Sequence, residues 1–96
     1  MEPVFEWNPK KASTNAKKHG VFFEEARTAF YDPLGRVIDD PEHSESEERA
    51  ILIAYSARSR LLFVAFTDRG DNKLRILSAR RATKRERQKH EKAIIH

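Results

Sequence analysis

The sequence contains no cysteine among its 96 residues. This absence excludes disulfide-stapled scaffolds, thiol nucleophiles and cysteine-based zinc sites. Long apolar runs are also missing, since the longest ones, Ala50 to Tyr55 and Leu61 to Phe66, are too short to cross a bilayer. The first residues show no basic stretch followed by an apolar one, so no secretory signal is expected. We therefore expect a cytoplasmic protein that folds as one domain over residues 1–96.

The motifs of several enzyme classes are absent as well. There is no glycine-rich phosphate loop, no G-x-S-x-G and no H-E-x-x-H, which argues against nucleotide hydrolases, serine hydrolases and zinc proteases. His43 lies in an acidic segment, where a His-x-Glu pair could bind a metal ion. No second histidine stands nearby, and the spacing matches no regular element, so a solvated loop is the preferred interpretation. No metal or other cofactor is expected.

Charge is present in quantity, and it is distributed unevenly. The net charge is +4, but residues 22–48 carry nine acidic groups against two basic ones, whereas residues 73–96 carry nine basic groups against two acidic ones. The basic end is the natural candidate for contacting the phosphates of a nucleic acid. A solvated basic face that binds nothing is the alternative that composition leaves open.

Local patterns predict an α+β fold of two N-terminal helices, a four-stranded antiparallel sheet and a C-terminal helix. Asn8 and Pro9 begin a helix that Gly20 ends, and a second helix runs from Phe23 to Tyr31. Alternation then predicts strands at residues 35–39, 49–55, 61–67 and 73–78, and the short turns between the last three require antiparallel neighbours. A capping box at residues 83–86 opens the last helix, which extends to about Ile94. We expect the helices to cover one face of the sheet.

The aromatic residues near the N-terminus have two interpretations. Phe5, Trp7, Phe22 and Phe23 could form a platform for stacking bases. A core role is preferred, because so small a chain needs their apolar area. Residues 4–7 could also extend the sheet as an edge strand.

The segment at residues 73–90 contains the most informative chemistry. Strand alternation directs Lys73 and Arg75 away from the apolar face, and Arg80 and Arg81 follow at the corner before the last helix, where we expect them to lie near Arg75. On that helix, His90 shares one face with Thr83, Arg87 and Ile94. Guanidinium groups grip phosphate bidentately and imidazole transfers protons near neutral pH, so the pattern favours phosphodiester chemistry.

His19 lies at the predicted C-terminus of the first helix, where the helix dipole favours an imidazolium. From the residues alone, a capping or packing role is the simpler interpretation of this histidine.

Taken in order, several short strings resemble the BrnT family of toxins from residue 5 to about residue 91. They comprise residues 5–11 (FEWNPKK), Asn15, residues 18–21 (KHGV), residues 23–26 (FEEA), Phe30 with Asp32 and Pro33, Glu48 with Arg49, residues 75–82 (RILSARRA), and Glu86 with Arg87. Each string is weak alone, but their order and spacing make the resemblance specific.

The resemblance implies a ribonuclease toxin of a type II toxin–antitoxin system with a RelE-like fold, which cleaves RNA without a metal ion and so inhibits translation and growth. It also implies a BrnA-type ribbon-helix-helix antitoxin, in a complex of two toxins on an antitoxin dimer that contacts operator DNA through the antitoxin.

The same resemblance suggests roles for individual residues. Arg75 and Arg80 would clamp the phosphate, His19 and Glu48 would act as general base or orienting group, and His90 would act as general acid. His90 stands where the family usually has a tyrosine. Further RNA contacts are expected from basic residues at the same end of the chain: Lys73, Arg81, Lys84 and Arg87. The alternative function is a non-catalytic nucleic-acid or protein binding module within a transcriptional repressor complex.

Overall fold

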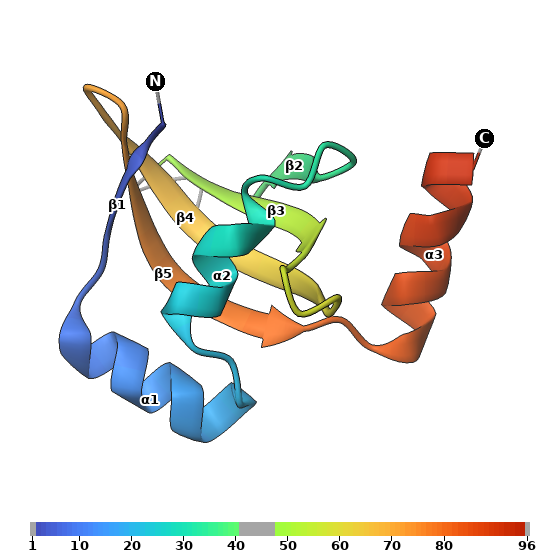
Figure 1. Ribbon diagram of the computed structural model, residues 1–96, viewed down its shortest axis with the longest axis horizontal. Helices are drawn as coiled ribbons and strands as arrows, with labels where there is room; N and C mark the ends of the chain where they lie inside the picture. The colour runs from blue at the N-terminus through green and yellow to red at the C-terminus, as the bar shows by residue number, and fades with distance from the viewer. Residues whose placement is uncertain (1, 41–47, 96) are drawn as a thin grey trace.

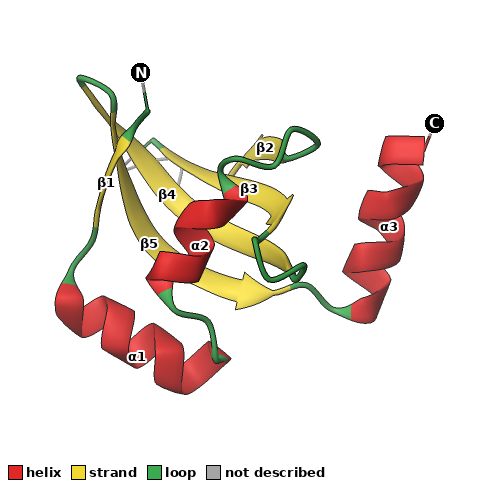
Figure 2. Ribbon diagram, in the orientation of Figure 1, coloured by secondary structure: helices red, strands yellow, loops and turns green. Residues whose placement is uncertain are grey.

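A computed structural model of the chain describes residues 2–40 and 48–95. The elements, in chain order, are β1 (Val4–Glu6), α1 (Pro9–His19), α2 (Phe23–Ala29), β2 (Arg36–Asp39), β3 (Arg49–Tyr55), β4 (Leu61–Gly70), β5 (Lys73–Arg81) and α3 (Lys84–Ile95). The strands form one sheet in the order β1-β5-β4-β3-β2. Figures 1 and 2 show α2 in front of this sheet, α1 below it on the side of β5, and α3 standing at one end. The predicted α+β class is confirmed.

The sheet differs from the prediction at one edge, because it has five strands and is not wholly antiparallel. β1 pairs in parallel with β5, with Glu6 opposite Arg75. The backbone N–H of Val4 also donates to the carbonyl of Asn72 (2.8 Å), and the Asn72 amide donates to the carbonyl of Glu2 (2.8 Å). Parallel pairing is possible here because the two strands are far apart in sequence, with two helices and three strands between them. The expectation that residues 4–7 could extend the sheet is confirmed.

Helix ends follow the predicted capping chemistry. The Asn8 side chain accepts hydrogen bonds from the N–H groups of Lys10 (2.8 Å) and Lys11 (3.1 Å), and so caps α1. Gly20 closes α1 with φ +69°, a left-handed conformation that glycine adopts without strain. At α3, the N–H of Glu86 donates to the Thr83 hydroxyl (3.1 Å), while the Glu86 carboxylate accepts from the N–H of Thr83 (2.9 Å).

The core lies between α2 and one face of β3, β4 and β5. Phe23 on α2 is completely buried and meets the inward side chains of the sheet, including Leu62 and Ile76. The ring of Trp7 packs edge-on against Phe23 (5.8 Å between centroids), and that of Phe5 contacts Phe30 (5.0 Å). The aromatic residues therefore serve the core, as expected, except for Phe22, which is exposed.

The position of α3 corrects the expectation that all helices cover one face. Its His90 contacts Arg36 and Tyr55, whose register places both on the face opposite to the α2 core. The sheet thus has one face covered by α2, an edge at β5 along which α1 packs, and a second face that α3 covers only at one end. This second face is called the open face below. No helix within residues 2–40 and 48–95 is long and apolar enough to span a membrane.

Candidate active site

A cavity of about 410 Å³ lies on the open face of the sheet. Its walls come from the C-terminus of α1, the residue that follows β2, the middle strands β3 and β4, and the far half of β5. The side chains that matter for chemistry or recognition are His19, Asp40, Phe63, Ser78 and Arg80. Two residues that the sequence singled out independently, His19 and Arg80, therefore meet in one place although 61 positions separate them.

A β-bulge places Arg80 on the open face. Arg75 and Arg80 are five positions apart, so a regular strand would direct them to opposite faces. The register shifts between Ile76, which pairs with Phe66, and Ser78, which pairs with Ala65. The extra residue, Leu77, reverses the alternation from that point onward. As a result both arginines project from the open face.

Arg80 is held in a fixed orientation by α3 and β4. Its guanidinium donates to both carboxylate oxygens of Glu86 (2.8 and 3.0 Å) and lies over the ring of Phe63, 4.4 Å from the centroid. The hydrogen bond from Arg80 holds the pKa of Glu86 down at about 2, and the same bond raises the pKa of Arg80. The site thus contains a preoriented cation whose charge is already balanced by one carboxylate.

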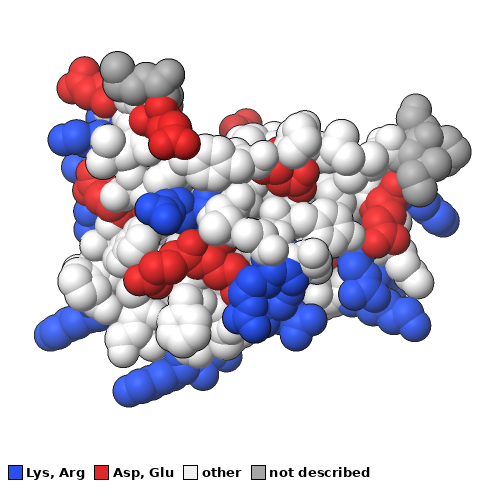
Figure 3. All heavy atoms as spheres, viewed as in Figure 1, with Lys and Arg blue, Asp and Glu red and all other residues white. Residues whose placement is uncertain are grey.

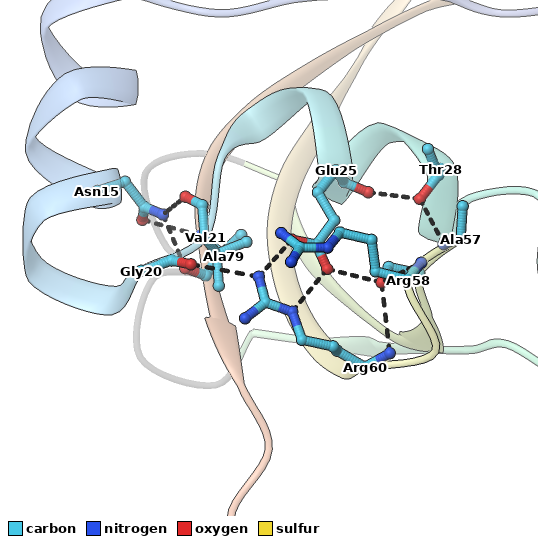
Figure 4. A network of polar contacts seen from close by, with 10 residues as sticks. Asn15, Gly20, Val21, Glu25, Thr28, Ala57, Arg58, Arg60 and Ala79 are labelled. Carbon is cyan, nitrogen blue, oxygen red and sulfur yellow. Dashed lines mark hydrogen bonds and ion pairs between the residues drawn. The ribbon is translucent and has the colours of Figure 1, made fainter.

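His19 reaches the cavity because one buried side chain ties α1 to β5. The Asn15 amide nitrogen donates to the carbonyls of Val21 (2.9 Å) and Ala79 (2.8 Å), and its oxygen accepts from the N–H of Ala79 (3.0 Å). Figure 4 shows this carboxamide between the two segments. Asn15 therefore pairs with β5 as a neighbouring strand would, and it holds the end of α1 beside Arg80.

A second buried network holds the loop after α1. The Glu25 carboxylate accepts from Arg60 through both oxygens and from the Ser56 hydroxyl (2.7 Å), and Arg60 also donates to the carbonyl of Gly20 (3.2 Å). The hydrogen bond from Arg60 is the main cause of the lowered pKa of Glu25, and the bond from Ser56 adds to it. Both outweigh burial, which alone would raise this pKa. The network anchors α2 and the α1–α2 turn to the hairpin between β3 and β4 (Figure 4).

The remaining predicted site residues lie elsewhere. Arg75 forms an ion pair with Glu6 on β1 (2.6 Å), and five strand residues, about 16 Å along β5, separate it from Arg80. The predicted proximity of Arg75 to Arg80 and Arg81 is therefore not found. Glu48 borders a separate hollow beside Thr67. The four residues expected to contact RNA, Lys73, Arg81, Lys84 and Arg87, are all exposed.

His90, the predicted general acid, does not line the cavity. Its side chain is only 1% exposed, and its Nδ1 accepts a hydrogen bond from Arg36 (3.4 Å). Its Nε2 is buried without a hydrogen-bond partner among the described residues. Burial, followed by the charge of Arg36, lowers the pKa of His90, although Asp32 and Glu91 act in the opposite direction. The arrangement gives His90 a part in docking α3: His90 and Glu86 are one helical turn apart and contact Arg36 and Arg80 respectively.

Sequence reasoning missed two polar residues of the cavity. Asp40 directly follows β2, is largely buried, and its N–H donates to the carbonyl of Arg49 (3.2 Å). Ser78 reaches the cavity only because of the bulge at Leu77. A carboxylate at the end of a strand is a signal that could have been followed, whereas no local pattern announces the bulge. His43 lies outside the described residues, within which no cluster of three metal-ligating side chains occurs.

Fold and cavity together define a class: a small α+β domain that presents an imidazole, a carboxylate and a guanidinium on an open sheet face, side chains capable of proton transfer beside a cation. The family model of the ribonuclease toxin BrnT of type II toxin–antitoxin systems matches residues 7–86. The chain therefore belongs to the BrnT family.

The fold agrees with that of a solved structure. The crystal structure of the Brucella abortus ribonuclease toxin BrnT superposes with a TM-score of 0.67 at 21% sequence identity, covering 88% of this chain and 100% of that one. No match to the chain was found among curated proteins.

Proposed function

We propose that the chain cleaves RNA in the cavity on the open face, by acid–base chemistry that needs no metal ion. The observation that carries this proposal is the convergence of His19, Asp40 and Arg80 in one cavity. A ribonuclease of this type needs a base, an acid and a cation. The three side chains supply one of each.

In the proposed reaction the 2′-hydroxyl of RNA attacks the adjacent phosphorus. The Asp40 carboxylate takes the hydroxyl proton as the new O–P bond forms, and the bond from phosphorus to the 5′-oxygen breaks. His19 gives a proton to that leaving oxygen, since imidazole is a common proton-transfer group in catalysis. Arg80 stabilises the added negative charge on the pentacovalent phosphorus. The products are a 2′,3′-cyclic phosphate and a 5′-hydroxyl.

The test is RNA cleavage by the purified chain in EDTA. His19→Gln, Asp40→Asn and Arg80→Ala should each lower the rate at least about 100-fold, with an unchanged circular dichroism spectrum. Arg69→Ala removes a cation near the end of β4 and serves as the matched control, with the wild-type rate expected. Cleavage that appears only with a divalent metal would overturn the metal-free scheme. RNA retained on a gel without products would favour a non-catalytic binding module.

We further propose that a BrnA-type ribbon-helix-helix antitoxin neutralises the chain in a complex of two copies each, which contacts operator DNA through the antitoxin. Membership in a family of type II toxins supports an antitoxin partner. The chain expressed alone in the bacterial cytoplasm should arrest growth, and coexpression of a neighbouring antitoxin gene should restore it. The mass of the purified complex then tests the two-to-two composition.

A further inference from the structure

A second hollow, of about 350 Å³, lies between α1 and β5. Two of the residues that line it, His19 and Ser78, also line the catalytic cavity, so the two hollows meet at these side chains. The groove exists because β1 pairs with β5 only as far as Arg75. Beyond that point no strand covers β5, and the face of α1 borders Leu77 and Ser78 instead.

The α1 side of this groove is basic. Lys10, Lys11 and Lys18 line it together with Thr14, and no carboxylate does. Within the described residues none of these lysines forms an ion pair, and α1 contains no acidic residue. In Figure 3 lysine and arginine side chains project from the lower left, where Figure 1 shows α1.

Helix stability does not account for two of these lysines. Lys10 and Lys11 occupy the first turn of α1, where the helix dipole disfavours positive charge. An acidic residue would stabilise that turn. The floor of the groove, in contrast, is structural, because the Asn15 carboxamide is fully occupied with Val21 and Ala79.

We propose that the groove between α1 and β5 binds the backbone phosphates of RNA nucleotides that flank the cleaved bond on the His19 side. This inference rests on the proposed function. A strand seated in the cavity continues into the hollow that shares its walls, and the mobile ammonium groups of Lys10 and Lys11 suit a flexible single strand without base preference. An acidic protein segment is the other polyanion that the groove could hold, but it would not need the connection to the cavity.

The test measures binding rather than cleavage, on a 2′-O-methyl oligonucleotide that lacks the attacking hydroxyl. Fluorescence anisotropy at several salt concentrations gives the slope of log Kd against log salt for the wild type and for K10Q/K11Q. Each phosphate contact on a single strand contributes about 0.7 to that slope, so the double variant should lose about 1.4. Lys17 is the matched control, because it lies on α1 but lines a different hollow, beside Phe22. K17Q should keep the wild-type slope.

An unchanged slope in K10Q/K11Q, or an equal loss of slope in K17Q, would overturn the proposal that this groove binds RNA. So would tighter binding of a polyglutamate peptide than of the oligonucleotide, if that binding is lost in K10Q/K11Q. Cleavage adds a second readout: the double variant should cleave a dinucleotide normally but an eight-nucleotide RNA roughly tenfold less efficiently. If the wild type cleaves no RNA but the slope is still lower in K10Q/K11Q, the proposed function is wrong and RNA binding in the groove is supported.

Discussion

Replacing Asn15 with alanine should destabilise the fold and disable the cavity together, because one buried carboxamide joins α1 to β5. The side chain is 6% exposed and makes three hydrogen bonds of 2.8–3.0 Å. At about 1 kcal/mol for each bond the loss is about 3 kcal/mol, and the buried backbone groups of Val21 and Ala79 that are left unpaired bring it to about 3–5 kcal/mol. The total free energy of unfolding of a domain of this size is about 5–14 kcal/mol. From the middle of that range, about 9 kcal/mol, such a loss leaves about 4–6 kcal/mol, and the variant should remain folded in buffer.

Urea denaturation followed by the fluorescence of Trp7 measures the loss. With a slope of about 1.5 kcal/mol/M, a loss of 3 kcal/mol lowers the midpoint by about 2 M. Asn15→Asp keeps the acceptor for the N–H of Ala79 but directs oxygen lone pairs at two carbonyls, so it should cost at least as much as alanine. Ser13→Ala, an exposed position on the same helix, is the control and should shift the midpoint little.

RNA cleavage by the folded Asn15→Ala variant tests the functional half of the prediction. His19 loses its fixed position beside β5, so the rate of RNA cleavage in buffer without urea should fall at least about tenfold. The reasoning is wrong if the free energy of unfolding drops by less than about 1 kcal/mol. It is also wrong if the variant, correctly folded, cleaves RNA at the wild-type rate.

Three further predictions concern charged and titratable groups. Arg60→Ala leaves the Glu25 carboxylate buried without its main partner and should lower the free energy of unfolding, measured by urea denaturation, by about 3 kcal/mol. Arg58 is the control, because its side chain is 66% exposed and 3.9 Å from Glu25. Arg58→Ala should lower the same quantity by less than about 0.5 kcal/mol. Glu86 has a pKa of about 2, below its ordinary 4.5, so its contribution to the free energy of unfolding is complete above pH 4.5 and is lost as the pH falls toward 2. In Glu86→Gln the urea midpoint should therefore fall less between pH 4.5 and pH 2 than in the wild type. The pKa of His90 is lowered in the folded chain, so the unfolded chain binds this proton more readily, and the free energy of unfolding should fall as the pH drops below 6.5. In His90→Phe the urea midpoint should change less between pH 7 and pH 5.5 than in the wild type. An unchanged pH dependence of the midpoint would contradict the docking role of His90.

Local chemistry predicted the parts of the fold that short stretches of chain determine. The Asn8 cap, the Gly20 terminator and the Thr83–Glu86 capping box are found as expected, because each depends on residues within four positions. The parallel pairing of β1 with β5 and the docking of α3 on the open face depend on residues more than fifty positions apart. Periodicity contains no information on such contacts.

The two arginines of β5 show why residue type alone could not define the site. Arg75 and Arg80 were equal candidates for a phosphate clamp, and the bulge at Leu77 does place both on the open face. Parallel pairing then brings Glu6 opposite Arg75, so the guanidinium of Arg75 ties the edge strand to the sheet. Arg80 instead lies where Asn15 brings the end of α1, and it therefore shares its cavity with His19. Which of the two arginines can take part in the proposed cleavage thus depends on which segment of distant chain covers each end of β5.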